Sequence, residues 1–301
     1  MDRNGREDQP QSRDALTKAS KLLAHCVVTC ESEANLRMTS RTDAIEFVKQ
    51  VHETLSKQTD LSPNNPIVTD CAKRFIEFLR ATYREEWASL LPDTPELAQI
   101  TGHLPLLCGQ AECQMEKWWC RRLIGYRDIS FNGLAEFWYF ENYRSLVTAE
   151  LALLGPAIAG RALFLGSGAL PLTAVLLARL LPGLSVRCVD NDPEACELSR
   201  ILVRRLGMEE RTTIIQGRAE DVRFQANDVV ICASLLEAPG LYDTLAKNGV
   251  KTIIIRDTEG LFRLCYKPAT EPAIGYCPGA RTTTCSSRIN ISRLFSLTDA
   301  L

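Results

Sequence analysis

The sequence predicts an α/β protein in which a helical N-terminal domain precedes a Rossmann-like domain. The first half shows helical periodicity, with one apolar stripe formed by Ile45, Val48, Val51 and Leu55. After Gly160 short apolar runs alternate with helical segments, which is typical of a parallel sheet covered by helices. We therefore expect three parts: a flexible N-terminus over 1–18, a helical lid or substrate domain over 19–157, and a Rossmann-like domain over 158–301.

Turn-forming residues separate the helices expected in the first half. A turn cluster at 60–66 precedes a helix through Cys71, Phe75 and Leu79, and the proline-rich stretch at 91–95 breaks the chain again. Two longer helices should follow, at about 95–124 and 137–154. The second of them should end at Gly155, because glycine and a following proline commonly terminate helices.

The second half contains five candidate strands, each followed by a helical pattern. They are Ala162–Leu165, Ser185–Val189, Thr212–Gln216, Asp228–Cys232 and Lys251–Arg256. Two later apolar runs are joined by a connection rich in proline and glycine. We expect these runs, Phe262–Tyr266 and Arg288–Leu294, to form an antiparallel pair that closes one edge of the sheet.

Composition excludes several classes of function. The 301 residues are 46% hydrophobic, so the chain can bury a sizeable core. The net charge of −2 gives no indication of a basic surface that would bind nucleic acid or an anionic membrane. The first thirteen residues are polar and charged, and no later apolar run reaches the length of a bilayer span. We therefore expect a cytoplasmic protein without nucleic-acid or membrane partners, and a homodimer is one possible assembly.

The 12 cysteines are spread along the chain and lie mostly within apolar stretches. This distribution favours free, buried thiols over a disulfide framework. The sequence has no Cys-x-x-Cys pair, and His25, Cys26 and Cys30 are the nearest approach to a metal-ligand cluster. We expect no metal site.

The loop Gly166-Ser167-Gly168 follows the first candidate strand and precedes a helical pattern. Glycines let backbone amides approach a ligand closely, and the following helix directs its positive N-terminus to the same place. A dinucleotide site requires a third glycine three residues after the second, where this chain has Pro171. The loop, continued through Leu170 and Pro171, therefore favours S-adenosylmethionine over a dinucleotide.

Three further loops should lie along the same crevice, since each follows the carboxyl end of a candidate strand. Asp190 is expected to accept hydrogen bonds from ribose hydroxyls, with Asn191 beside it, whereas Asp192 is expected to cap the next helix. The other predicted cofactor-binding residues are Ala219 and Glu220 after the third strand and Ala233 and Ser234 after the fourth.

The helical half contributes candidate catalytic residues. Glu112 and Glu116 lie four residues apart, hence on one helix face, and mutual repulsion in an apolar setting would raise the pKa of one of them. The alternative is a solvated face, for which Lys117 and Arg121 are available partners. Tyr139 and Tyr143 also share a helix face, and aromatic packing is the alternative to a functional role.

Several motifs resemble one family, the nicotianamine synthases. Segment 166–173 resembles their glycine loop Gly-Ser-Gly-x-Leu-Pro-Leu-Thr, and segments 107–116, 137–150, 190–193 and 256–260 resemble other family motifs in the same order. The chain departs from the family at Glu259, where the family has histidine, and at Trp138 and Phe140, whose bulk suggests a smaller acceptor pocket.

The resemblance implies a class I S-adenosylmethionine-dependent fold that transfers the 3-amino-3-carboxypropyl group of S-adenosylmethionine to an amine and releases methylthioadenosine. The acceptor would be an amino acid, with histidine and S-adenosylmethionine itself as the candidates, and the product a nicotianamine- or opine-type metallophore. Glu112 or Glu116, with Tyr139 or Tyr143, would supply the base, and Arg256 would hold a substrate carboxylate or orient the site. The alternatives are a small-molecule N- or O-methyltransferase on the same fold and a non-catalytic cofactor-binding protein.

Overall fold

A computed structural model describes residues 40–155, 158, 160–272, 275–283, 285 and 289–298. The predicted flexible N-terminus lies outside these residues, as do His25, Cys26 and Cys30. Within the described part, no helix is long and apolar enough to cross a membrane.

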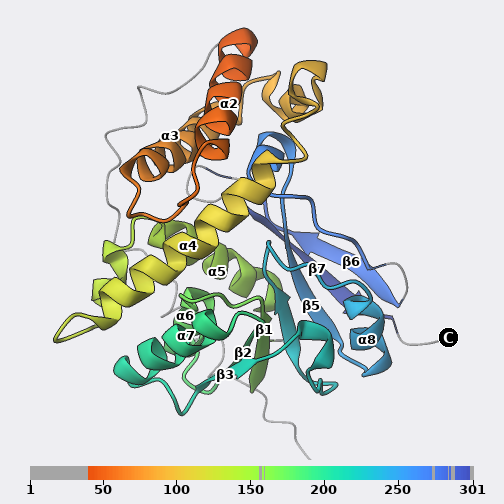
Figure 1. The fold of residues 1–301 in the computed structure, drawn as a ribbon. Helices are drawn as coiled ribbons and strands as arrows, with labels where there is room; N and C mark the ends of the chain where they lie inside the picture. Colours follow the sequence, from red (N-terminus) through yellow and green to blue (C-terminus); the bar gives the residue numbers. More distant parts are fainter. Residues whose placement is uncertain are drawn as a thin grey trace, which may run out of the picture.

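The first half of the described chain is helical, as the sequence predicts (Figure 1). The apolar stripe of α2 is buried, and Asn65 caps α3 by accepting a hydrogen bond from the backbone amide of Ile67. The helix predicted from residue 95 begins later, because a 3-10 turn and Gly102 come before Pro105 in the first turn of α4. The helices are α2 (Arg41–Ser56), α3 (Pro66–Thr82), η2 (Ala88–Asp93), η3 (Pro95–Leu97), α4 (Leu104–Ile124), η4 (Asn132–Glu136) and α5 (Phe140–Leu154).

The second half of the described chain forms a seven-stranded sheet in the order β3-β2-β1-β4-β5-β7-β6. β1 to β5 are parallel, and each lies within one residue of its predicted bounds. Apolar side chains bury the central strands on both faces. The strands are β1 (Arg161–Leu165), β2 (Ser185–Asp190), β3 (Thr212–Gln216), β4 (Val229–Cys232), β5 (Thr252–Asp257), β6 (Tyr276–Arg281) and β7 (Ile291–Leu297).

The predicted closing pair of strands is half wrong. β7 overlaps the second predicted run, but its antiparallel partners are β5 and β6, and residues 262–266 form no strand. Gly260, with φ +53°, opens the 3-10 helix η7 (Gly260–Leu264), whose apolar side chains are buried against η2. The sequence predicts a strand at residues 262–266 because a short apolar run has the same pattern in a buried helix and in a strand. The edge strand β6 is not predicted, because it is exposed, contains Pro278 and Gly279 and lacks an apolar pattern.

The helical half packs directly on the sheet domain. Figure 1 shows α4 running between the pair α2 and α3 and the α/β part of the molecule. It contacts α7, while α5 contacts α6 and β7. Residues of α4 and α5 are thereby brought to the carboxyl ends of the parallel strands. The helices and the short 3-10 segment of the α/β part are α6 (Leu172–Leu180), α7 (Pro193–Arg205), η6 (Ala219–Asp221) and α8 (Leu241–Lys247).

Candidate active site

A cavity of about 550 Å³ opens where β1, β2 and β4 end and is covered by α4 and α5. This is the usual ligand position of a doubly wound sheet. The cavity brings together thirteen of the sixteen predicted functional residues: Glu112, Glu116, Tyr143, Gly166, Ser167, Gly168, Asp190, Asn191, Ala219, Glu220, Ala233, Ser234 and Arg256.

The glycine loop is shaped by left-handed backbone conformations. Gly166 has φ +74° and Gly168 has φ +67°, a region that side chains with a Cβ rarely adopt. A Cβ on Gly168 would overlap Oε2 of Glu116, so this glycine also makes room for the carboxylate above it. Between them, the hydroxyl of Ser167 is buried on the cavity wall without a hydrogen-bond partner among the described residues. An unpaired buried hydroxyl at this position suits a polar ligand.

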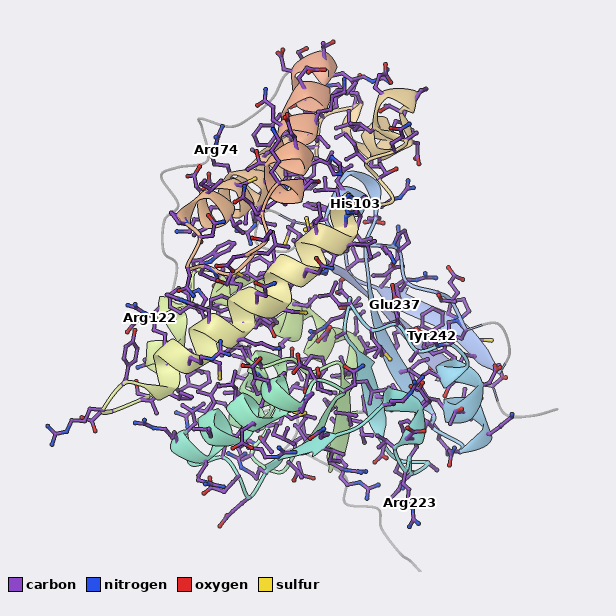
Figure 2. All side chains as sticks on the ribbon, viewed as in Figure 1. Arg74, His103, Arg122, Arg223, Glu237 and Tyr242 are labelled. Carbon is purple, nitrogen blue, oxygen red and sulfur yellow. The ribbon has the colours of Figure 1, made fainter. Side chains whose placement is uncertain are left out.

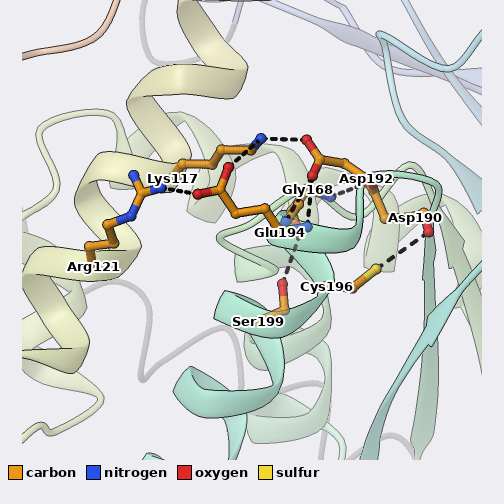
Figure 3. A network of polar contacts seen from close by, with 9 residues as sticks. Lys117, Arg121, Gly168, Asp190, Asp192, Glu194, Cys196 and Ser199 are labelled. Atoms are coloured by element: carbon orange, nitrogen blue, oxygen red, sulfur yellow. Dashed lines mark hydrogen bonds and ion pairs between the residues drawn. The ribbon is translucent and has the colours of Figure 1, made fainter.

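Asp190 connects the glycine loop to the start of α7 (Figure 3). Its Oδ2 accepts a hydrogen bond of 2.7 Å from the backbone amide of Gly168, and its Oδ1 accepts one of 2.9 Å from that of Asp192. A carboxylate has about four acceptor positions, so Asp190 keeps capacity for ligand hydroxyls. Asp192 caps α7 through the amides of Glu194 and Ala195, as the sequence predicts.

Two predicted cofactor residues lie behind the cavity wall. Leu170 is buried, and its backbone amide donates a hydrogen bond to Glu116. Pro171 immediately precedes α6. Both residues shape the loop in this structure, and neither side chain lines the cavity.

Glu112 and Glu116 face the cavity from α4, and neither pairs with the lysine and arginine that follow them. Lys117 instead binds Asp192 at 2.5 Å and Glu194 at 2.9 Å, and Arg121 also binds Glu194 (Figure 3). These cations fasten α4 to the N-terminus of α7, where acidic side chains gather. The predicted alternative of a solvated glutamate face is therefore wrong.

The hydroxyl groups of Tyr143, Tyr266 and Tyr139 form a chain of phenols beside the two glutamates. Tyr143 donates a hydrogen bond to Oε1 of Glu116 and lies 3.5 Å from Oε1 of Glu112. Tyr266 donates to Oε2 of Glu112 at 2.7 Å, and its oxygen lies 3.4 Å from that of Tyr139. Sequence reasoning missed Tyr266 because it lies in the run assigned to an edge strand, where nothing distinguishes it from a packing residue.

Burial gives both glutamates unusual acid-base properties. Loss of solvation raises the pKa of Glu112, and it raises the pKa of Glu116 to about 8, with the nearby charge of Glu112 acting in the same direction. Burial also raises the pKa of Tyr143 and Tyr266 well above the usual range, so these phenols stay protonated and act as donors. A cationic ligand entering the cavity would draw the proton away from the carboxyl groups.

We expect the free energy of unfolding to fall as pH rises from about 5 to 8. The pKa of Glu116 rises from its ordinary 4.5 to about 8 on folding, so in this window the native state holds a proton that the unfolded chain has released. The resulting stabilisation is complete below pH 4.5, falls between pH 4.5 and about 8 at up to about 1.4 kcal/mol per pH unit, and is fully lost above the folded-state pKa of about 8. Urea unfolding across this range measures the slope. Glu116→Gln should flatten it, and an unchanged slope would assign the effect to other groups.

The side chain of Arg256 is buried, and its guanidinium is paired with protein groups. Its guanidinium binds both oxygens of Glu150, at 2.8 and 3.0 Å, and the hydroxyl of Thr173 at 2.8 Å. Glu150 is fully buried and also accepts a hydrogen bond of 2.8 Å from Ser292. Of the two predicted roles for Arg256, this geometry favours orienting the site over a bidentate grip on a substrate carboxylate.

A second cavity of about 260 Å³ lies on the other side of the phenol chain. Glu112 and Tyr266 line both cavities and so form part of the wall between them, and Tyr139 faces only the second. Trp138 also lines it, whereas Phe140 packs against Phe131 with ring centres 6.4 Å apart. Of these two aromatic residues, only Trp138 lines the second cavity.

Comparison with known proteins identifies the family. Residues 38–241 match the family model described as nicotianamine synthase protein. A nicotianamine synthase from Solanum lycopersicum is 28% identical over 244 residues, covering 76% of this chain and 74% of the relative. L-Histidine 2-aminobutanoyltransferase from Yersinia pestis is 27% identical over 150 residues. This match covers 49% of this chain and 52% of the relative, so the chain spans about half the length of that relative.

Solved structures agree on the fold. MtNAS in complex with MTA and tNA has a TM-score of 0.71 at 21% identity, covering 87% of this chain and 100% of that chain. A variant of MtNAS in complex with S-adenosylmethionine has a TM-score of 0.72 at 22% identity, covering 85% of this chain and 98% of that chain. The predicted fold and family are both confirmed, and the chain belongs to the nicotianamine synthase family.

Proposed function

We propose that this protein transfers the 3-amino-3-carboxypropyl group of S-adenosylmethionine to the amine of an amino-acid acceptor, releasing methylthioadenosine. The observation that carries the proposal is the position of Glu112, a half-buried residue on the wall between two cavities, where loss of solvation raises the pKa of its carboxyl group. One cavity would hold S-adenosylmethionine and the other the acceptor, with the base between them. Family membership and the Yersinia relative, named for aminobutanoyl transfer to histidine, support this assignment.

The sheet-side cavity offers groups suited to each part of S-adenosylmethionine. Asp190 would accept hydrogen bonds from the ribose, and Ala219 and Glu220 would lie against the adenine. Ser167, with its unpaired hydroxyl, and Glu116, above Gly168, would receive the polar end of the methionyl part. Among the described residues no group of His, Cys, Asp and Glu side chains is arranged to hold a metal ion, and the proposed transfer requires none.

Position selects the carbon that reacts. All three carbons on the sulfonium are activated, so an acceptor amine must lie in line with the methionyl Cγ rather than the methyl group. The amine nitrogen forms the new bond to Cγ, and the Cγ–S bond breaks with its electron pair passing to sulfur. Glu112 removes the proton from the attacking amine, while Tyr266 and Tyr143 donate hydrogen bonds that hold the carboxylate in place.

The identity of the released nucleoside tests the proposal. Purified protein incubated with S-adenosylmethionine and a mixed amino-acid pool should release methylthioadenosine, with product mass increased by one aminobutyrate unit. Stoichiometric S-adenosylhomocysteine would instead establish a methyltransferase. Binding of S-adenosylmethionine without turnover across the pool would favour a non-catalytic binding protein. The same reaction should identify the acceptor, for which histidine and S-adenosylmethionine itself are the first candidates, and the number of transfers.

We expect Asp190→Ala to weaken S-adenosylmethionine binding by about tenfold to a hundredfold. The change removes acceptors for charge-assisted hydrogen bonds to the ribose and also releases the amide of Gly168. Isothermal titration of wild type and variant measures the affinity, and Asp243→Ala, on α8, serves as the matched control. Equal affinities for wild type and Asp190→Ala would refute the ribose assignment.

A further inference from the structure

The second cavity has walls of an unusual composition. Most of its lining is apolar, and three tryptophans contribute to it, together with Met115 and the ring of Phe75. The tryptophans are held in place by neighbours. The indole nitrogen of Trp118 donates to Asn64 at 2.9 Å, Trp119 packs on Phe137, and Trp138 packs on Tyr139. Such walls form a preformed slot for a flat or apolar group.

Two polar residues of α3 interrupt this apolar lining. Thr69 and Lys73 both line the cavity and lie four residues apart, so they share one helix face. The hydroxyl oxygen of Thr69 is buried without a hydrogen-bond partner among the described residues, and Lys73, an exposed residue, forms no ion pair within the described part of the chain. An ammonium and an unpaired hydroxyl on one face of a cavity match a carboxylate ligand.

Glu112 supplies the carboxylate that would pair with the ammonium group of a zwitterionic ligand. It lines the same cavity from α4 and accepts from Tyr266, so an amine placed there has a carboxylate partner. The described lining includes no arginine and no lysine other than Lys73. A second carboxylate on a ligand side chain would therefore find an apolar wall or the like charge of Glu112, and burying it would be costly.

We propose that this cavity binds an α-amino acid with an aromatic or apolar side chain as the acceptor, its carboxylate held by Lys73 and Thr69 and its amine by Glu112. The inference rests on the proposed transferase function and adds the chemical class of the acceptor. The volume of about 260 Å³ lies below the roughly 300–1,000 Å³ of pockets for drug-sized ligands, which disfavours a second S-adenosylmethionine as acceptor. Thr69, Lys73 and Trp138 are thus specificity-determining residues.

The experiment measures methylthioadenosine release with single acceptors. Phenylalanine, leucine and histidine should exceed aspartate, glutamate and S-adenosylmethionine alone by at least about tenfold in kcat/KM. Phenethylamine and histamine, which lack the carboxylate, should fall about tenfold to a hundredfold below phenylalanine and histidine. Lys73→Met should lose this preference for the carboxylated acceptor through a higher acceptor KM, while the KM for S-adenosylmethionine stays within about twofold.

A matched control removes a positive charge from the same helix. Arg74→Met changes the neighbouring residue of α3, which does not line the cavity, and should keep the carboxylate preference (Figure 2 labels Arg74). Thr69→Val, which keeps the shape and removes the hydroxyl, should raise acceptor KM in the same sense as Lys73→Met. The acceptor proposal is overturned if acidic amino acids react best, or if Lys73→Met keeps the wild-type preference. Release of S-adenosylhomocysteine with every acceptor would instead overturn the transferase function.

Discussion

Glu112→Gln is expected to lower kcat by about 10²–10⁴-fold, the usual contribution of a positioned general base. The acceptor amine is mostly protonated at neutral pH, and Glu112 is the carboxyl that both cavities share. Glutamine keeps the size of the side chain and its contact with Tyr266 but cannot accept the proton. Methylthioadenosine release under saturating substrates measures kcat, and titration calorimetry should show nearly unchanged affinity for S-adenosylmethionine.

Glu116→Gln is the matched comparison, since it makes the same change one helical turn away. Glu116 lies against the glycine loop, where its oxygen approaches Gly168, and we expect it to bind the cofactor-side ligand rather than the acceptor. Its substitution should therefore weaken S-adenosylmethionine binding more than it lowers kcat. If Glu116→Gln abolishes turnover while Glu112→Gln retains it, the two roles are reversed.

Arg256→Met is expected to lower the free energy of unfolding by about 3–5 kcal/mol. The change leaves the carboxylate of Glu150, which has no solvent exposure, without its cation, while the hydroxyl of Ser292 still donates a hydrogen bond to it. The cost comes from an uncompensated buried charge rather than from the loss of a strong pair. Urea unfolding at pH 7 measures it directly.

Two controls separate this explanation from a general effect of arginine removal. Arg263→Met breaks a more exposed pair with Asp93 and should cost no more than about 1 kcal/mol. The double variant Arg256→Met with Glu150→Met removes both charges and should recover part of the lost stability. A loss below about 1 kcal/mol for Arg256→Met alone would contradict a buried, fully paired guanidinium.

Sequence patterns were sufficient for the parts of the fold that depend on local periodicity. The parallel strands are buried on both faces, so their apolar runs are continuous and end at clear turns. Asp192 is predictable as the N-cap of α7 because it directly precedes Pro193 at the start of the helical pattern. The glycine loop is similarly local, because positive φ and the approach of a ligand both require glycine.

Other features depend on contacts that no local pattern contains. The partners of Lys117 and Arg121 are more than seventy residues away on α7, so the sequence alone left a solvated glutamate face open. Tyr266 becomes a site residue only because η7 brings it beside Glu112, 154 residues earlier. Edge strand β6 was missed since exposure on both faces removes the alternation by which strands are recognised.

The ion pairs that join Lys117 and Arg121 on α4 to Asp192 and Glu194 have a consequence for how the proposed transferase would acquire new acceptors. Lys117 and Arg121 attach one edge of α4 to the sheet domain, and Glu116 on the same helix lies against the glycine loop. The second cavity, the proposed acceptor site, is lined from the opposite side by α3 and by the residues that precede α5. In the proposed reaction, substitutions there would change what is bound without moving the base, so substrate range and catalytic geometry would be free to evolve separately along one helix.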